Sequence, residues 1–241
     1  MLEKQTAAEL QHARRVREMF SGIATKYDFL NHFLSVNVDK RWRRLVSEKL
    51  KDVLDDPNAL VLDVACGTGD LSLELQKEAR AKVFGTDFCR PMLAIASGKN
   101  GKQNTKIPYT EADGMNLSFA DETFDAVTIA FGLRNFSNWQ AGLGELHRVI
   151  KQHGKLVILE FSTPIIPGFR QAFQFYFSNI LPRIGGAVSG SRGAYEYLPD
   201  SVTKFPDQKN LVKMMSETGF SDVEYKNLTG GIAAIHSGVK L

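Results

Sequence analysis

The run from Leu60 to Leu71 combines residue types that can bind a nucleoside. LVLDVACGTGDL begins with an apolar stretch, reaches Asp63, and then turns at Gly67 and Gly69 into a helical pattern. Glycines between a strand and a helix let the backbone approach a ligand closely, and the start of the helix presents unpaired amide groups. This arrangement is typical of the nucleotide-binding end of a doubly wound α/β sheet.

The glycine spacing favours one class of nucleotide over another. A dinucleotide-binding turn reads GxGxxG, whereas here no third glycine follows Gly69 at the required distance. The register Asp63-x-Ala65-x-Gly67-x-Gly69 instead resembles motif I of the class I S-adenosylmethionine-dependent methyltransferases, with alanine in place of the first glycine.

A second acidic residue supports this interpretation. The segment from Lys82 to Asp87 predicts another strand that ends in a carboxylate, which can accept hydrogen bonds from both ribose hydroxyls of an adenosine. Each element alone also fits an ordinary acid that caps a helix after a strand. Together, at this spacing, they predict a nucleoside site.

Composition limits the class of protein without naming it. The 241 residues are 43% apolar and 24% charged, as in an ordinary globular protein long enough for a sizeable core. Two cysteines provide no disulfide framework and no CxxC metal spacing, so we expect a reducing, cytoplasmic environment. No stretch is apolar enough to span a membrane, and a net charge of +3 is too small to indicate nucleic-acid binding.

The order of predicted elements is that of an α/β protein. Residues 1–55 form a predicted helical cap with helices at 6–20, 27–34 and 39–54, and residues 56–241 form the predicted catalytic domain, the two making one structural unit. We expect helices at 69–79, 90–99, 138–151 and 207–218, and strands at 60–64, 82–86, 106–111, 124–130, 154–161, 220–227 and 231–239. The fold class is therefore α/β, a doubly wound, mostly parallel seven-stranded sheet, Rossmann-like, whose last strand is antiparallel.

Residues 164–205 interrupt this alternation with four prolines and several glycines. They contain one aromatic helical pattern, from Phe169 to Ile180, which fits either core packing or an apolar channel for a lipid tail. We hypothesise that this insertion and the N-terminal helices form a mobile lid.

The third and fourth strands end in residues that could complete the site. Asp113 and Gly114 follow the third strand, and Phe-Gly-Leu-Arg-Asn-Phe at 131–136 follows the fourth. Because ligands of open α/β sheets bind at the carboxyl ends of the strands, Arg134 is expected near the reacting group. An arginine is not an ordinary base, since its pKa exceeds about 12, but it can bind a phenolate or an ordered water and stabilise developing negative charge.

Motifs distributed along the chain resemble the ubiquinone/menaquinone biosynthesis C-methyltransferase family, the UbiE type. They include Phe20-Ser21-x-Ile23-Ala24-x-Lys26-Tyr27-Asp28-x-x-Asn31, the 131–135 segment, Leu159-Glu160-Phe161-Ser162, Tyr195-x-Tyr197-Leu198 and Asn227-Leu228-Thr229-Gly230-Gly231. The resemblance implies methyl transfer from S-adenosylmethionine to a ring carbon of a polyprenylated quinol. Its methyl donor would be bound by Asp63, Gly67, Thr68, Gly69, Asp87, Asp113 and Gly114, with Ala130 lining the site.

The same resemblance assigns the acceptor side. Arg134 is the expected catalytic residue, and Tyr27, Asn31, Asn135 and Tyr197 are the expected substrate-binding residues. No metal is expected, since no His/Asp/Glu cluster has catechol-methyltransferase spacing. Two departures from the family pattern are Ala130, where many members have serine, and Gln152-His153-Gly154, which replaces a Pro-Gly-Gly turn.

Several alternatives stay open at this level. The acceptor could be another lipid or phenol, or the chain could be a non-catalytic S-adenosylmethionine-binding assembly protein. The cluster Lys40-Arg41-Trp42-Arg43-Arg44 fits either peripheral contact with the inner face of a membrane or a solvated helix face with one packed tryptophan. His236 fits either a proton relay or a core histidine. The pattern does not distinguish a benzoquinol from a naphthoquinol, nor does it define the tail length or a monomer against a homodimer.

Overall fold

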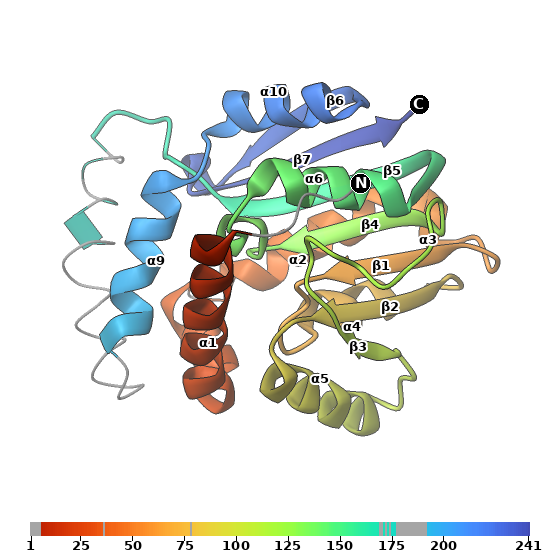
Figure 1. The fold of residues 1–241 in the computed structure, drawn as a ribbon, viewed down its shortest axis with the longest axis horizontal. Coiled ribbons are helices and arrows are strands. Elements are labelled where there is room, and N and C mark those ends of the chain that lie inside the picture. Colours follow the sequence, from red (N-terminus) through yellow and green to blue (C-terminus); the bar gives the residue numbers. More distant parts are fainter. Residues whose placement is uncertain are drawn as a thin grey trace.

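A seven-stranded sheet forms the centre of the molecule (Figure 1). The computed structural model describes residues 6–35, 37–77, 79–168, 171, 173, 175–176 and 192–241. The strand order of the sheet is β3-β2-β1-β4-β5-β7-β6. Strand β7 is antiparallel to both of its neighbours, and the other pairs are parallel. The predicted doubly wound, mostly parallel sheet is confirmed. The strands are β1 Leu60–Val64, β2 Lys82–Asp87, β3 Tyr109–Glu111, β4 Phe124–Ala130, β5 Ile150–Phe161, β6 Phe220–Leu228 and β7 Ala233–Lys240.

The central strands are buried on both faces because helices cover both sides of the sheet. Alternate residues of β1 and β4 enter two different core clusters: Val61 and Ala126 belong to one, Leu62 and Val127 to the other. The first cluster includes residues of α2 and α4, and the second includes residues of α6 and α10. The helices are α1 Ala7–Leu34, α2 Val38–Lys49, α3 Lys51–Leu54, α4 Asp70–Gln76, α5 Arg90–Gln103, α6 Trp139–Val149, α9 Arg192–Lys204 and α10 Gln208–Thr218.

Several boundaries differ from the sequence-based predictions, and the helix expected at 39–54 is divided into α2 and α3. The helices expected at 6–20 and 27–34 are one continuous α1, because the residues between them include the buried Ile23 and Ala24. β3 is shorter than expected, and α9, which carries Pro199 inside it, lies within the predicted irregular insertion. The predicted helix at 169–180 falls largely outside the described residues.

The fifth strand begins earlier than expected. Gln152-His153-Gly154, which replaces the Pro-Gly-Gly turn of the family pattern, forms a bulge in this strand. β5 starts at Ile150, where Ile150 pairs with Phe124, and the pairing then jumps to Lys155 opposite Ala126. His153, within this irregularity, has a φ of 63° in the left-handed region. The bulge lies at the amino end of β5, away from the carboxyl edge of the sheet.

Helix α1 crosses the carboxyl edge of the parallel strands (Figure 1) and contacts α2, α5 and α9. The following helix, α2, buries Trp42, whose side chain packs against Phe131 and Phe161 and donates from Nε1 to Thr229 Oγ1 at 3.1 Å. Trp42 is therefore packed against the sheet, whereas Arg43 beside it is buried rather than solvated, and contact of this cluster with a membrane stays a prediction. Among the described residues no helix has the length and apolarity needed to cross a bilayer.

His236 on β7 is a core histidine. It is 2% exposed, lies 3.1 Å through Nε2 from the carbonyl oxygen of Gln208, and stacks on Tyr225. Burial lowers the pKa of His236 to about 4, so the ring stays neutral in the folded chain at physiological pH.

We expect His236 to weaken the fold under acid conditions. The unfolded histidine binds a proton near pH 6.5 and the folded one only near 4, so the stabilisation present above pH 6.5 is lost as the pH falls toward 4. The loss amounts to about 3 kcal/mol. Urea unfolding at pH 7.5 and 4.5 should show that His236→Gln loses less stability between these pH values than the wild type. The exposed His153→Gln is the matched control, and an equal acid loss in wild type and His236→Gln would contradict the prediction.

Candidate active site

A cavity, partly open to solvent, lies where the chain order of the sheet reverses between β1 and β4. This is the position at which open α/β sheets bind ligands. The ends of β1, β2 and β4 and the inner side of α1 contribute its walls. The predicted residues that line it are Tyr27, Asp63, Gly67, Thr68, Asp87, Asp113, Gly114, Ala130 and Asn135.

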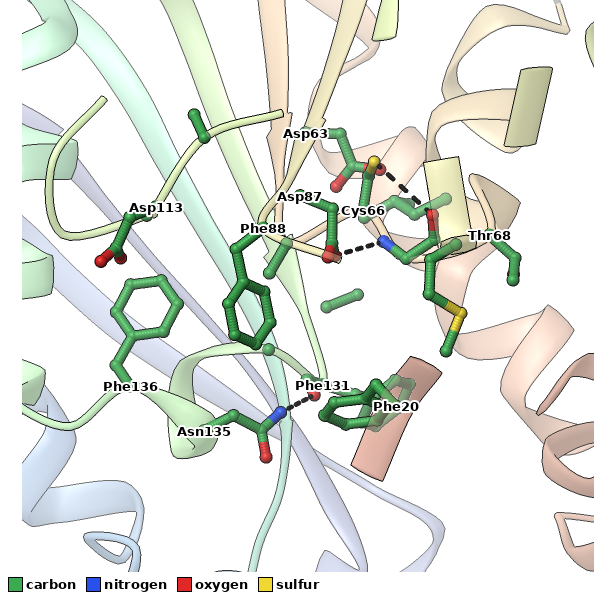
Figure 2. A pocket seen from close by; sticks show the side chains of 18 of the residues that line it. Phe20, Asp63, Cys66, Thr68, Asp87, Phe88, Asp113, Phe131, Asn135 and Phe136 are labelled. Carbon is green, nitrogen blue, oxygen red and sulfur yellow. Dashed lines mark hydrogen bonds between the residues drawn. The ribbon is translucent and has the colours of Figure 1, made fainter. Parts of the chain in front are cut away.

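The glycine turn closes the cavity at the end of β1 and is tied to Asp87 on the neighbouring strand (Figure 2). Gly67, at φ 55°, donates its amide hydrogen to Asp87 Oδ2 at 2.8 Å, and the Cys89 amide donates to Asp87 Oδ1 at 2.8 Å. Each carboxylate oxygen therefore keeps a lone pair for a further donor. Burial raises the pKa of Asp87 to about 6, because the backbone amides only partly offset desolvation.

Asp63 lines the cavity beneath the turn, where its carboxylate accepts hydrogen bonds from neighbouring elements. The β1–β4 register places Asp63 opposite Thr128, on the face where α4 packs. Ser72 of α4 donates to Asp63 Oδ2 at 2.6 Å, and Thr128 donates to Oδ1 at 3.1 Å. Burial raises the pKa of Asp63 to about 7 despite these two hydroxyl donors. One contribution of Asp63 is thus to hold the strand, the helix and the neighbouring strand together under the cavity.

Gly69, unlike Gly67, does not line the cavity. Its φ is 82°, and a Cβ built on it would lie 2.5 Å from the Tyr109 hydroxyl and 3.0 Å from the Ala96 Cβ. This glycine is required where α4 begins close to β3 and α5. Gly69 therefore has a packing role next to the turn, and its assignment to the methyl donor stays a prediction.

Gly69→Ala is expected to destabilise the protein by about 2–4 kcal/mol, from left-handed strain and overpacking together. Thermal or urea unfolding would measure the loss. In the Tyr109→Phe background the loss should shrink, because the oxygen that the new methyl group meets is gone. A Gly69→Ala variant as stable as the wild type would contradict this account of the position.

The far end of the cavity is built from aromatic rings around a second glycine. A Cβ on Gly114 would lie 2.3 Å from the Phe136 ring, so the ring packs directly on this backbone. Phe88 faces the same end of the cavity, with Asp113 nearby (Figure 2). A flat apolar slot with one carboxylate at its edge is suited to a purine base, which offers two faces for stacking and an amino group for hydrogen bonding.

Arg134 lies just outside this cavity, in a buried ion pair. It belongs to the 3-10 turn Leu133–Asn135 after β4, and its Nη1 donates to Glu160 Oε1 at 2.8 Å and to the Phe131 carbonyl. Its backbone amide donates to Glu160 Oε2 at 3.3 Å. Burial raises the pKa of Glu160, opposed by the Arg134 charge. The buried Nε of Arg134 has no hydrogen-bond partner among the described residues, which leaves one donor free.

The remaining predicted acceptor residues fall in two places. Asn135 lines the cavity, donates from Nδ2 to the Phe131 carbonyl at 3.2 Å, and buries an Oδ1 that has no partner among the described residues. Tyr197 of α9 lies instead within electrostatic range of the ion pair. Burial raises the pKa of its hydroxyl, the charge of Arg134 lowers this pKa, and the charge of Glu160 raises it. The side chain of Asn31 lies outside the described residues.

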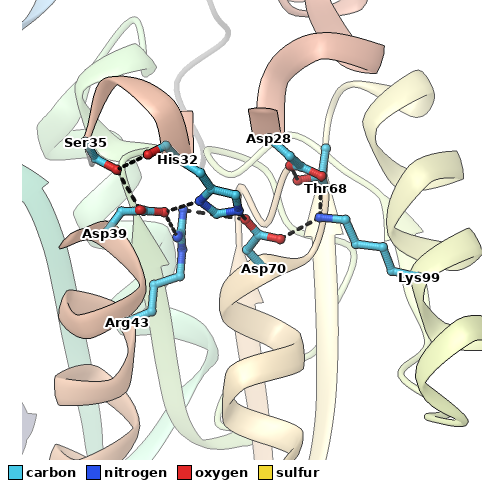
Figure 3. Close-up of polar contacts among 8 residues, drawn as sticks. All are labelled: Asp28, His32, Ser35, Asp39, Arg43, Thr68, Asp70 and Lys99. Carbon is cyan, nitrogen blue, oxygen red and sulfur yellow. Dashed lines mark hydrogen bonds and ion pairs between the residues drawn. The ribbon is translucent and has the colours of Figure 1, made fainter. Parts of the chain in front are cut away.

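A chain of ion pairs joins the N-terminal helices to the glycine turn (Figure 3). Thr68 donates its hydroxyl hydrogen to Asp28 of α1, and Lys99 of α5 lies 2.6 Å from Asp28 and 2.5 Å from Asp70. The His32 ring bridges to Asp70, the first residue of α4, at 3.4 Å. These contacts hold α1 over the cavity, and the sequence-based prediction missed them because they connect residues remote in the chain.

The residues present fit S-adenosylmethionine. The Asp87 carboxylate is buried at the cavity wall with lone pairs free for ribose hydroxyls, and the aromatic slot beside Gly114 suits adenine. Thr68 and the Gly67 backbone line the cavity at the glycine turn, above the buried Asp63. Within the described part of the chain, no three His, Cys, Asp or Glu residues are grouped as a metal ion would require.

Comparison with known proteins identifies the relationship. The model of the ubiE/COQ5 methyltransferase family matches residues 7–240. The chain belongs to this family. A demethylmenaquinone methyltransferase of Thermus thermophilus is 48% identical to the chain over 221 residues, which are 91% of this chain and 99% of the relative. A ubiquinone/menaquinone biosynthesis C-methyltransferase UbiE of Citrifermentans bemidjiense is 44% identical over 234 residues, 95% of this chain and 98% of the relative. The predicted family is confirmed.

Solved structures confirm the fold. An S-adenosylmethionine-dependent methyltransferase of Thermotoga maritima superposes with a TM-score of 0.63 at 16% identity, covering 93% of this chain and 99% of its own. A phosphoethanolamine N-methyltransferase of Haemonchus contortus, in complex with S-adenosylmethionine, gives a TM-score of 0.59 at 14% identity, over 82% of this chain and 52% of its own. Both share the sheet on which the candidate site is built.

Proposed function

We infer that this chain is an S-adenosylmethionine-dependent methyltransferase that methylates a ring carbon of a polyprenylated quinol in menaquinone or ubiquinone biosynthesis. The observation that carries this inference is the match of the ubiE/COQ5 model to residues 7–240, joined to a cavity that fits the methyl donor. The two acceptors to consider are demethylmenaquinol and 2-methoxy-6-polyprenyl-1,4-benzoquinol. Relatives named for one or both of these routes support the choice.

The residues that line the cavity would bind the methyl donor. Bound S-adenosylmethionine supplies a methyl group that its sulfonium already activates for transfer. Asp87 would accept hydrogen bonds from the ribose hydroxyls, and Asp113 with the Gly114 backbone would hold the adenine end. Thr68, Gly67 and Ala130 would line the path between them, so the chain mainly orients the donor and excludes water.

The acceptor side of the proposal rests on the buried ion pair. A quinol carbon becomes nucleophilic when a ring hydroxyl loses its proton, and the Arg134 guanidinium would stabilise the resulting phenolate, directly or through a water. Glu160 holds the guanidinium through a hydrogen bond from Nη1, and it also accepts one from the backbone amide of Arg134. Tyr27, Asn31, Asn135 and Tyr197 would orient the ring, and Asn135 buries an amide oxygen that could accept from the second ring hydroxyl.

Peripheral contact with a membrane is a further part of the proposal, since the acceptor carries an isoprenoid tail. Ile165 and Ile166, immediately beyond β5, expose 60% and 51% of their surface. Lys40 and Arg41 are exposed on α2. Co-sedimentation with anionic vesicles tests this contact, and loss of co-sedimentation in an Ile165→Ser, Ile166→Ser variant would support it.

The decisive experiment incubates the full chain with S-adenosylmethionine carrying a labelled methyl group and each reduced precursor quinol, followed by mass analysis of the lipid. Incorporation into one or both quinols supports the function and separates the two acceptors. Incorporation only into another phenol or lipid would favour a different methyltransferase activity. Donor binding without methylation of any acceptor would favour a non-catalytic assembly role.

A further inference from the structure

One basic side chain faces a cavity whose other charges are acidic. Of the described residues that line it, Asp63, Asp70, Asp87 and Asp113 carry carboxylates, and Arg43 is the only cation. The side chain of Arg43 is 9% exposed, so its guanidinium is largely shielded from bulk water. A buried cation next to a ligand cavity is either part of a structural ion-pair network or a partner for an anionic group of the ligand.

The surroundings of Arg43 hold the guanidinium in one orientation (Figure 3). Asp39, one turn earlier on α2, accepts a hydrogen bond from Nη1, and Asp39 is itself bound by Ser35 Oγ at 2.6 Å and His32 Nδ1 at 2.8 Å. Nη2 lies 3.8 Å from Asp70 Oδ2, which is beyond hydrogen-bond range. The guanidinium is therefore preorganised through Nη1, while Nη2 makes only a loose ion pair.

Arg43 belongs to the end of the cavity that is opposite the adenine slot. Its charge acts on Asp63 under the glycine turn, and its guanidinium lies 5.9 Å from the centre of the Phe131 ring at the end of β4. Asp113 and Phe136 lie together at the other end, with Asp87 between the two (Figure 2). If adenosine occupied the Asp87 and Phe136 side, the amino-acid part of the donor would extend toward Arg43.

We propose that Arg43 binds the α-carboxylate of the amino-acid moiety of the methyl donor. The inference rests on the proposed function, because it requires that an S-adenosyl amino acid occupies the cavity. An arginine fork is matched to a carboxylate, and no other cation lines the described cavity wall. Helix α2 would then have two roles: Trp42 packs the helix onto the sheet, and Arg43 binds the α-carboxylate of the donor.

A pair of ligands that differ only in this group tests the proposal. S-adenosylhomocysteine carries the carboxylate, whereas S-adenosyl-3-thiopropylamine is the same molecule without it. Calorimetric titration of the wild type is expected to show tighter binding of the first by about 10- to 100-fold, the range for a hydrogen bond to a charged group. Arg43→Gln should reduce this preference to within about twofold.

The matched control is Arg44→Gln on the same helix, whose side chain is 67% exposed and lies 3.8 Å from Glu74. It should keep the wild-type preference for the carboxylate. Because Arg43→Gln leaves Asp39 without its cation, the double variant Asp39→Asn, Arg43→Gln is measured beside it, with circular dichroism as the check on folding. Both are expected to bind S-adenosyl-3-thiopropylamine as the wild type does.

The outcomes separate the inference from the function on which it rests. A wild type with no preference between the two ligands, or Arg43 variants that keep the full preference, would overturn the role of Arg43. Equal weakening of both ligands in the Arg43 variants would also overturn it and assign the residue to the structural network. Failure of the wild type to bind either ligand would instead overturn the proposed function.

Discussion

Replacing Arg134 by glutamine is expected to lower kcat for quinol methylation by about 100- to 1000-fold, the loss typical of removing one group that stabilises developing negative charge. Binding of S-adenosylhomocysteine should change by less than about threefold, because Arg134 does not line the donor cavity. Single-turnover methylation and calorimetric titration of the same preparation would separate the two quantities. A variant that binds the donor normally and methylates at the wild-type rate would exclude Arg134 as the catalytic group.

The ion pair makes a second measurement necessary for this variant. Removing Arg134 leaves the carboxylate of Glu160, which is 1% exposed, without its cation, and such a loss typically costs about 3–5 kcal/mol of stability. The double variant Arg134→Gln, Glu160→Gln removes both charges and should recover most of the stability without recovering kcat. If activity returned together with stability, Arg134 would be a structural residue and the acceptor would be activated elsewhere.

Patterns that are local in the chain predicted the sheet and the donor half of the site. Apolar runs, the acids Asp63, Asp87 and Glu111 at or next to the ends of β1, β2 and β3, and glycines after β1 mark the strands and the edge at which they meet. This edge is where the cavity lies. For this reason the sequence could predict Gly67 and Thr68, which line the cavity. Gly69 belongs to the same motif, but its close contact with Tyr109 could not be predicted, because no local pattern shows which side chain approaches it.

Contacts between distant segments explain most of what the sequence did not predict. Asp28 meets Thr68 and Lys99, and Arg43 meets Asp70, only because α1 and α2 fold back over the glycine turn. One local signal was available: Asp39 and Arg43 are four residues apart on a helix, a spacing that favours an ion pair. It could have separated Arg43 from the exposed arginines of the same cluster.

Asp87→Asn is expected to weaken binding of S-adenosylmethionine by about 100-fold. Two ribose hydroxyls would donate to this carboxylate, and hydrogen bonds to a charged group contribute about 1.5–3 kcal/mol each. The asparagine also has one acceptor oxygen where the backbone amides of Gly67 and Cys89 both need one, so the glycine turn loses a partner. Equilibrium dialysis measures the affinity. Glu111→Gln, at the end of the neighbouring strand β3 and outside the cavity lining, is the matched control and should leave the affinity unchanged.

The pH dependence of binding distinguishes this role from a purely structural one. Burial raises the pKa of Asp87 to about 6, and donors on a bound ribose favour the ionised carboxylate. Affinity should therefore be constant above about pH 7 and fall as the pH drops through 6, by up to about tenfold per pH unit below it. Asp63, with a pKa of about 7, titrates nearby, so the comparison of wild type with Asp87→Asn isolates the contribution of Asp87. If the loss of affinity near pH 6 were the same in Asp87→Asn as in the wild type, Asp87 would not contact the ribose. The donor would then be held chiefly by the slot around Gly114 and by the glycine turn.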